Sequence, residues 1–262
     1  MKVFISADLE GATGVTAWDK ADEVVGMTAD VNAAVEGALA AGATEVVVRD
    51  AHETARNLPL DKVHPRARLL RGWADLALMM EGLDESYDAA FLVGYHARAM
   101  TETGVLAHTM SDQIRSLRIS GIECGEYGIS AVHAGHFGVP VVLACGDQDL
   151  ADQVVEFIPG IETVAVKTGL TRTCALSLSA EQAREAIQAA AQRALARRTE
   201  IAPCRPEAPL RVELELADPR SASLCALVPG TERVGRTAVR CEAEHGLAVA
   251  QVLGVYLKLM HG

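Results

Sequence analysis

Residues 2–14 read Lys-Val-Phe-Ile-Ser-Ala-Asp-Leu-Glu-Gly-Ala-Thr-Gly, an apolar run that ends in two acidic residues and a glycine-rich turn. Residues 3–7 are rich in strand-forming side chains, and the glycines that follow permit tight turns. The same plan, a short apolar run followed at once by polar residues, recurs three times along the chain. The recurrences are 45–49 before Asp50-Ala51-His52, 89–93 before Gly94-Tyr95-His96, and 139–144 before Gly146-Asp147-Gln148-Asp149. We expect each run to be a buried strand.

Amphipathic segments separate these strands. Residues 29–41 are expected to form a helix that Thr28 or Asp30 caps and Gly42 ends, and residues 73–81 a second helix. Strands that alternate with helices form βαβ units, in which successive strands pair in parallel. Aromatic residues are scarce, at 4%, and a core of small aliphatic residues suits such a sheet. The sequence therefore predicts an α/β fold with a mostly parallel sheet covered by helices.

The last third of the chain changes character and predicts a second, smaller α/β domain. Its expected elements are a helix over 180–198 opened by the capping box Ser179-Ala180-Glu181-Gln182, strands at 210–216 and 237–241, and a final helix over 247–260. We therefore divide the chain into a larger domain, residues 1–165, and a smaller domain, residues 166–262.

Composition excludes several classes of protein. Of the 262 residues, 50% are apolar and 23% charged, which is typical of a globular chain that buries a sizeable core. A formal net charge of −11 disfavours nucleic acid and anionic membrane surfaces as partners. No stretch approaches the roughly 20 apolar residues that cross a bilayer. Six cysteines without a CxxC pair, in a sequence with no secretion signal, indicate reduced thiols and a cytoplasmic protein.

Metal-binding side chains follow three of the expected strands. Asp8 and Glu10 lie two residues apart, a spacing that points both carboxylates to one side of an extended backbone. His52 follows the second strand and His96 the third. Ligand sites of open α/β sheets form beyond the carboxyl ends of the strands, so these four side chains are expected to converge. Such a set suits zinc, or manganese or cobalt, and a further carboxylate would allow two ions.

Each of these residues alone also has an ordinary structural explanation. Asp8 could cap a turn, Glu10 and His52 could be solvated loop residues, and His96 could pack in the core. Their convergence at strand ends favours the metal site. For the pairs His133/His136 and Asp147/Asp149 we prefer structural roles, a packed helix end and a helix N-cap. Glycine-rich phosphate loops, a GxSxG turn and an HExxH motif are all absent from the sequence.

Four motifs in this order resemble the DppA-type D-aminopeptidase family, and the likeness runs nearly from end to end. The motifs are Ser6-Ala7-Asp8-Leu9-Glu10-Gly11, Asp50-Ala51-His52, Gly94-Tyr95-His96-Ala97-Arg98-Ala99 and Gly125-Glu126-Tyr127-Gly128. The resemblance continues through Val166-Lys167 and Leu227-Val228-Pro229-Gly230-Thr231. The family consists of self-compartmentalising zinc peptidases with two metals per subunit, so the resemblance implies two zinc ions and a ring-shaped homo-oligomer.

The resemblance also assigns roles to residues. Asp8 would bridge two ions, Glu10 and His96 would complete one site, and His52 and Glu126 the other. His108, in Gly104-Val105-Leu106-Ala107-His108-Thr109-Met110, matches the family's catalytic histidine. The larger domain would then be the metal-binding catalytic one, and the smaller would serve oligomerisation and substrate access.

These inferences predict a dinuclear zinc aminopeptidase that removes the N-terminal residue of short peptides, with D-amino-acid peptides as a candidate class. His108 would act as general base or as nucleophile. Lys167 and Arg172 could hold the peptide carboxylate or be solvated surface residues. The alternatives are a metal-dependent amidase or phosphoesterase acting on a non-peptide substrate, and a non-catalytic metal-binding scaffold. Structural zinc sites are usually rich in cysteine, and the cysteines here form no cluster in the sequence, which disfavours the scaffold.

Overall fold

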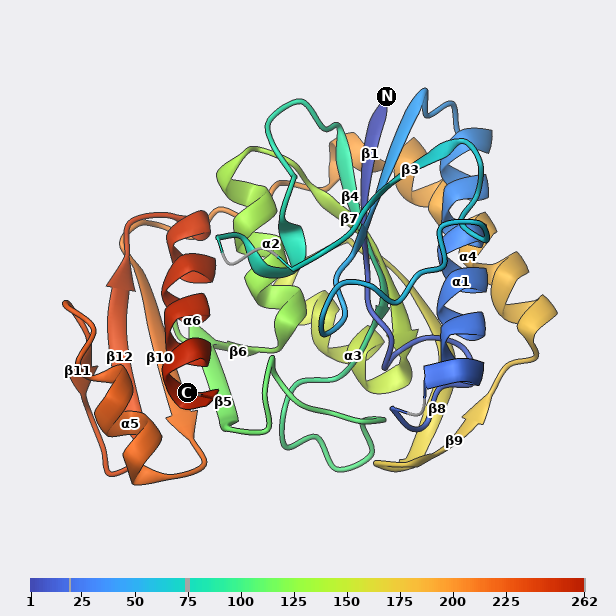
Figure 1. The fold of residues 1–262 in the computed structure, drawn as a ribbon. Helices are drawn as coiled ribbons and strands as arrows, with labels where there is room; N and C mark the ends of the chain where they lie inside the picture. The colour runs from blue at the N-terminus through green and yellow to red at the C-terminus, as the bar shows by residue number, and fades with distance from the viewer. Residues whose placement is uncertain (19, 74–75, 262) are drawn as a thin grey trace.

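A seven-stranded sheet forms the larger of two lobes in the computed structural model, which describes residues 1–18, 20–73 and 76–261 (Figure 1). Its strands are β1 (Lys2–Ala7), β2 (Glu45–Asp50), β3 (Ala67–Leu70), β4 (Ala89–Tyr95), β7 (Val141–Asp147), β8 (Glu162–Thr171) and β9 (Cys174–Ser177). They lie in the order β3-β2-β1-β4-β7-β8-β9, and only β9 runs antiparallel to its neighbour. The predicted α/β class with a mostly parallel sheet is confirmed.

Helices cover both faces of this sheet. The helices α1 (Lys20–Ala40) and α4 (Ala180–Ala196) pack against each other on one face, and α2 (Glu126–His136) and α3 (Gln148–Phe157) lie on the other (Figure 1). The strands β4 and β7 are buried along their whole length, because helices on both faces shield a central parallel strand. Ser179 caps α4 and forms the predicted capping box with Gln182.

Two helix predictions differ from the structure. The helix α1 begins well before residue 29, so neither expected cap lies at its start: the Thr28 hydroxyl donates to the Val24 carbonyl inside the helix. Asp30 instead accepts hydrogen bonds from the backbone and hydroxyl of Thr13. In the part of residues 73–81 that the structure describes, the only regular element is the 3₁₀ turn η1 (Leu78–Met80); residues 74–75 of the predicted helix lie outside the description.

A five-stranded antiparallel sheet forms the smaller lobe (Figure 1). Its strands are β5 (Ile114–Ile119), β6 (Ile122–Cys124), β10 (Leu210–Leu216), β11 (Glu232–Arg233) and β12 (Ala238–Ala243), in the order β11-β12-β10-β5-β6. The helices α5 (Pro219–Cys225) and α6 (Gly246–His261) pack on it, and η2 (Arg198–Glu200) follows α4. Helix α6 also packs against α2, so it joins the two lobes.

The two sheets divide the chain differently from the expected boundary at 165/166. That boundary falls inside β8, and both β9 and α4 belong to the larger lobe. The smaller sheet in turn recruits β5 and β6 from the middle of the chain. Strand β10 alternates buried and exposed residues and pairs on both sides, with β12 and with β5, so the smaller sheet needs a strand from each region.

The chain changes direction in the larger sheet between β1 and β4. It runs from β1 outwards to β2 and β3 and then returns to the other side of β1 as β4. The loop after β1 is held against the end of β4, because the Gly11 amide donates to the Gly94 carbonyl at 2.8 Å. A Cβ on Gly11 would lie 1.6 Å from the Tyr95 carbonyl oxygen, and Gly94 has a φ of +74°. Glycine is therefore required on both sides of this crevice, which is where open α/β sheets place their ligands.

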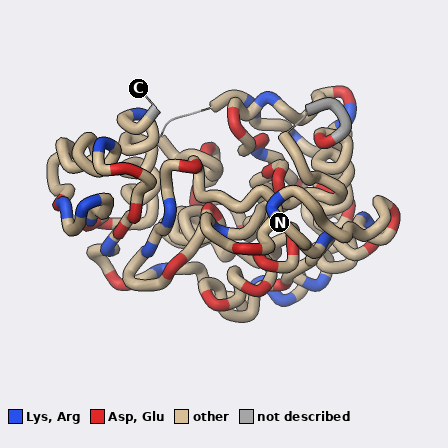
Figure 2. Tube along the Cα trace, turned by 90° about the horizontal axis from the view of Figure 1, so that it is seen from below, with Lys and Arg blue, Asp and Glu red and all other residues tan. Residues whose placement is uncertain are grey.

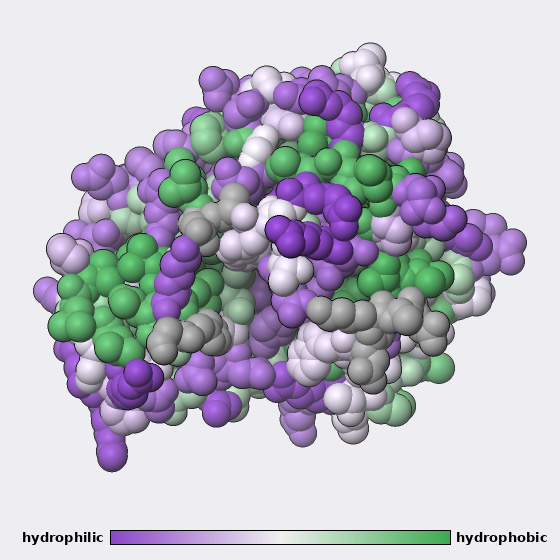
Figure 3. Space-filling view, viewed as in Figure 1, coloured by the Kyte–Doolittle hydropathy of each residue, from purple (hydrophilic) through white to green (hydrophobic). Residues whose placement is uncertain are grey.

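The surface carries charges of both signs. Lysines and arginines are distributed among the acidic residues over both lobes (Figure 2). Apolar side chains gather on the smaller lobe (Figure 3), where Leu227 and Val255 are exposed. Among the described helices, none is long and apolar enough to cross a membrane.

Candidate metal centre

The structure brings together all six residues that were predicted for the site from the sequence. Asp8 and Glu10 lie on the loop after β1, His52 after β2, His96 after β4, His108 between β4 and β5, and Glu126 at the start of α2. The five proposed metal ligands Asp8, Glu10, His52, His96 and Glu126 are buried, and the side chain of His108 is partly exposed. Two halves of the sheet and a helix N-terminus therefore contribute to one cluster.

One group of ligand atoms surrounds His52. Its Nδ1 lies 3.2 Å from Asp8 Oδ1 and 3.1 Å from Glu10 Oε2. Each of the three residues offers an atom within 4.8 Å of the others. The loop that carries His52 is itself fixed by Asn57, whose side-chain amide donates to the His52 carbonyl at 2.6 Å and to Asp50 at 3.0 Å. His52 is thus held where it faces both carboxylates.

A second group of ligand atoms surrounds His96. Its Nε2 lies 3.6 Å from Asp8 Oδ2 and 3.5 Å from Glu126 Oε2. The two groups share Asp8, with one oxygen facing each histidine. This arrangement corrects the pairing that the resemblance implied: Glu10 lies with His52, and Glu126 lies with His96. The order of these residues in the sequence could not reveal this pairing.

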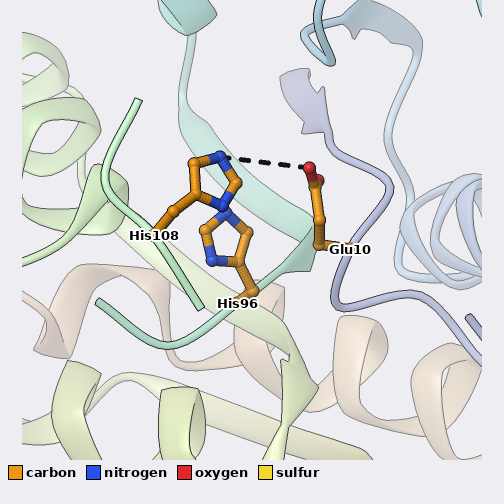
Figure 4. Close-up of side chains that lie close together, drawn as sticks. All are labelled: Glu10, His96 and His108. Atoms are coloured by element: carbon orange, nitrogen blue, oxygen red, sulfur yellow. Dashed lines mark ion pairs between the residues drawn. The ribbon is translucent and has the colours of Figure 1, made fainter. Parts of the chain in front are cut away.

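His108 lies beside both groups. Its ring stacks on His96 with centroids 4.4 Å apart, and its Nε2 lies 4.0 Å from Glu10 Oε1 (Figure 4). The same Nε2 lies 3.5 Å from Glu126 Oε1. The Nδ1 atom faces the Leu106 carbonyl at 2.9 Å and donates to it, so Nε2 is left free on the side of the carboxylates. Glu10, His96 and His108 form a third group of possible ligand atoms.

The cluster concentrates charge in a buried place. Burial and the neighbouring Glu10 charge raise the pKa of Asp8 to about 7. Burial opposes the charged form of His96, but the carboxylates of Glu126, Glu10 and Asp8 outweigh it and raise its pKa to about 10. The pKa of His52 rises to about 11 for the same reason, through Asp8 and Glu10. Three carboxylates so close together require cations, either protons on the histidines or metal ions.

The atoms facing each other between Asp8 and His96 fit a metal ion. Asp8 Oδ2 and His96 Nε2 are buried, and neither makes a hydrogen bond within the described part of the chain. His96 Nδ1 donates to the Ala97 carbonyl at 2.9 Å, which leaves a lone pair on Nε2 when the ring is neutral. Two lone pairs that face each other repel unless a cation lies between them. Carboxylate oxygens and imidazole nitrogens are ligands that zinc accepts.

The cluster opens into a cavity of about 910 Å³. This volume is at the upper end of the range for small-molecule sites and exceeds that of a dipeptide. Its lining combines acidic residues with two tryptophans and the side chain of Leu257 from α6: Asp8, Glu10, Trp18, Ala51, His52, Glu53, Thr54, Arg56, Trp73, Met79, His108, Met110, Ser111, Asp112, Gln113, Glu126 and Leu257. Both lobes therefore contribute to the wall.

Neither basic residue considered for a peptide carboxylate is free to take that role. Lys167 is buried, and its ammonium donates to the carbonyls of Glu10, Ala12 and Val15 at 2.5, 2.9 and 2.6 Å. Burial lowers its pKa to about 8. Lys167 therefore holds the loop that carries Glu10 and is not a surface residue. Arg172 is half exposed and pairs with Asp112 at 3.0 Å.

The residues expected to be structural do lie outside the cluster. His133 is buried in α2, and burial and the neighbouring His136 lower its pKa to about 4. The His136 ring packs against His245 with centroids 4.3 Å apart. The Asp147 side chain accepts the Leu150 amide and caps α3, as predicted.

The strand-end pattern alone would have missed two residues of the cluster. His108 lies on a long loop and Glu126 follows an antiparallel strand of the other sheet, so neither comes after an apolar run of the parallel sheet. A glutamate at the first position of a helix is ordinary in sequence. What distinguishes Glu126 is its burial at that position, together with the Met110 amide that donates to its carboxylate at 2.6 Å.

A carboxylate and histidine cluster at the switch point of an α/β sheet, opening into a peptide-sized cavity, is the arrangement of a metallohydrolase. The family model described as D-aminopeptidase matches residues 1–255. A D-aminopeptidase of Bacillus subtilis (strain 168) is 33% identical over 268 residues, which cover 99% of this chain and 97% of that protein. The structure of the Zn-dependent D-aminopeptidase DppA from Bacillus subtilis, a self-compartmentalizing protease, superposes with a TM-score of 0.94 at 33% identity, covering 100% of this chain and 98% of that one. The chain belongs to the D-aminopeptidase family and is a peptide hydrolase.

Proposed function

We propose that the chain is a dinuclear zinc aminopeptidase that removes the N-terminal residue, including D-residues, from short peptides. The observation that carries this proposal is the pair of ligand groups that share Asp8, with His52 and Glu10 on one side and His96 and Glu126 on the other. The zinc-dependent structural relative supports the choice of metal. A bound zinc ion lowers the pKa of water and polarises a carbonyl oxygen.

The residues of the chain would then move the protons. His108 Nε2 would accept a proton from the attacking water and return it to the leaving amine, because it is free, partly exposed and beside the cluster. Its Nδ1 bond to the Leu106 carbonyl keeps Nε2 directed towards the site. The acidic lining favours the free ammonium of a peptide N-terminus, which distinguishes an aminopeptidase substrate from a neutral amide.

We also propose an oligomeric state, from the structural relative, and a cellular compartment, from the cysteines. The self-compartmentalizing structural relative supports a ring-shaped homo-oligomer, for which the exposed apolar side chains of the smaller lobe are candidate contact residues. All six cysteines are free, which agrees with a cytoplasmic protein.

Metal analysis and paired substrates test the proposal. Purified protein should contain about two zinc ions per chain, and hydrolysis of D-alanyl and L-alanyl dipeptides should stop with chelator and return with zinc. Protein without transition metal that still hydrolyses these peptides would disprove the mechanism. If the wild-type chain hydrolyses only L-dipeptides, the proposed activity on D-residues is wrong and the aminopeptidase activity stands.

A further inference from the structure

Trp18 connects the loop after β1 to the cluster. Its indole Nε1 donates to Glu10 Oε1 at 2.8 Å, and its ring meets the His108 ring edge-on with centroids 6.4 Å apart. The side chain lines the cavity and is 43% exposed. A partly exposed tryptophan whose single N–H group donates to a buried carboxylate has a role beyond filling space.

Arg172 lies over this indole and is itself held by Asp112. The Arg172 guanidinium lies 5.6 Å from the centroid of the Trp18 ring, within the range of a cation–π contact. Arg172 is held in turn by Asp112, at 3.0 Å from Nη2. Its backbone carbonyl accepts the Leu106 amide at 2.8 Å. Three segments distant in sequence, the loop after β1, the turn after β8 and the loop before β5, therefore meet on one side of the cavity.

The hydrogen bond from Trp18 decides how the Glu10 carboxylate is turned. The terminal torsion of a glutamate is broad, so neighbours set its orientation. With Oε1 engaged by the indole, Oε2 faces His52 at 3.1 Å. A neutral donor achieves this without adding positive charge, so the carboxylate keeps its full charge for a metal ion. A lysine or arginine at this position would compete with the metal.

We propose that Trp18 is a positioning residue, whose indole N–H orients the Glu10 carboxylate for zinc while Arg172 and Asp112 hold the ring. The inference rests on the proposed function and goes beyond it, because it assigns metal affinity to residues that touch no metal. Outer partners of metal ligands typically contribute about 10–100-fold in affinity.

Zinc affinity measured by competition with a chelating dye tests the proposal. Trp18→Phe keeps an aromatic ring but loses the donor, and we expect one of the two zinc ions to bind about 10-fold or more weakly. Trp73→Phe is the matched control, since Trp73 lines the same cavity from the loop after β3. Its zinc affinity should equal that of the wild type. Equal affinities for Trp18→Phe and the wild type would overturn the proposal.

The support of the ring is tested on the exposed arginine. Arg172→Met should weaken the same zinc site several-fold, and Arg172→Lys should restore part of the loss because it keeps a cation near the ring. Arg172 is half exposed, so both variants are expected to fold. If Met and Lys at this position gave the same zinc affinity as arginine, the ring would need no support and that part of the proposal would fail.

Fluorescence gives a readout that does not depend on activity. The chain has two tryptophans, so Trp73→Phe leaves Trp18 as the single indole. Its emission should change as zinc is added to metal-free protein, because the charge of its hydrogen-bond partner is then neutralised. Emission that stays constant while zinc binds would overturn the proposed link between Trp18 and Glu10. A wild-type chain that binds no zinc at all would instead overturn the proposed function and this inference with it.

Discussion

Replacing His133 should change how the stability of the protein depends on pH. This histidine is 1% exposed, and its Nδ1 makes no hydrogen bond within the described residues. Its pKa falls from 6.5 to about 4 in the folded chain, mainly through burial. The unfolded chain therefore takes up a proton near pH 6.5, whereas the folded chain does so only near pH 4. The stability that the neutral ring provides is present above pH 6.5 and is lost as the pH falls towards 4.

The size of the effect follows from these values. Each pKa unit corresponds to about 1.4 kcal/mol. Between pH 7 and pH 5, proton uptake by His133 in the unfolded chain should lower the free energy of unfolding by about 2 kcal/mol. Other groups also titrate in this range, so the informative quantity is the difference between wild type and His133→Gln, which is neutral at both pH values.

Urea unfolding followed by circular dichroism at the two pH values measures this difference. The wild type should lose about 2 kcal/mol more than His133→Gln between pH 7 and pH 5. His133→Leu serves as a second neutral variant, so that a packing effect peculiar to glutamine can be recognised. Equal losses in all three proteins would refute the reasoning, because they would show that the buried ring takes up its proton as readily as an exposed one.

Four further changes test the site and the loop that carries it. Asp8→Ala should lose both zinc and activity, since Asp8 belongs to both ligand groups. Zinc content and dipeptide hydrolysis measure the two losses, and a variant that keeps one tightly bound zinc ion would contradict the prediction. His108→Ala should retain zinc while kcat falls by about 10²–10⁴-fold, and a normal rate would exclude its catalytic role. Gly11→Ala should cost about 1–3 kcal/mol in thermal unfolding, because the added methyl group would lie 1.6 Å from the Tyr95 carbonyl; an unchanged Tm would show that the loop can move freely. Lys167→Met should lower the free energy of urea unfolding by several kcal/mol by leaving three buried carbonyls without their donor, and a change below about 1 kcal/mol would count against that bond network.

The strand ends of the larger sheet could be predicted from the sequence. Buried parallel strands appear as continuous apolar runs, and the residue at which such a run stops marks the edge where ligands lie. That is why Asp8, His52 and His96 could be placed together before the structure. The fold class followed from the same pattern, because parallel strands require covering helices.

The remaining features depend on contacts that a local pattern does not contain. Strand β5 contains no continuous apolar run and is defined by its pairing with β10, far along the chain. The division of ligands between the two groups depends on how the carboxylates are turned, which Trp18 and Met110 decide for Glu10 and Glu126. His108 was identified by resemblance alone, because a loop histidine has no pattern of its own.

The interleaved order of the smaller sheet has a consequence for synthesis on the ribosome. The hairpin β5–β6 is made midway through translation, but β10, which pairs with the open edge of β5, emerges only after the whole larger lobe has been translated. A nascent chain therefore exposes an unpaired strand edge that other chains can join. Leu257, near the end of the last helix, is part of the cavity wall, so an interrupted chain cannot complete its substrate cavity. Premature termination should give insoluble fragments without peptidase activity.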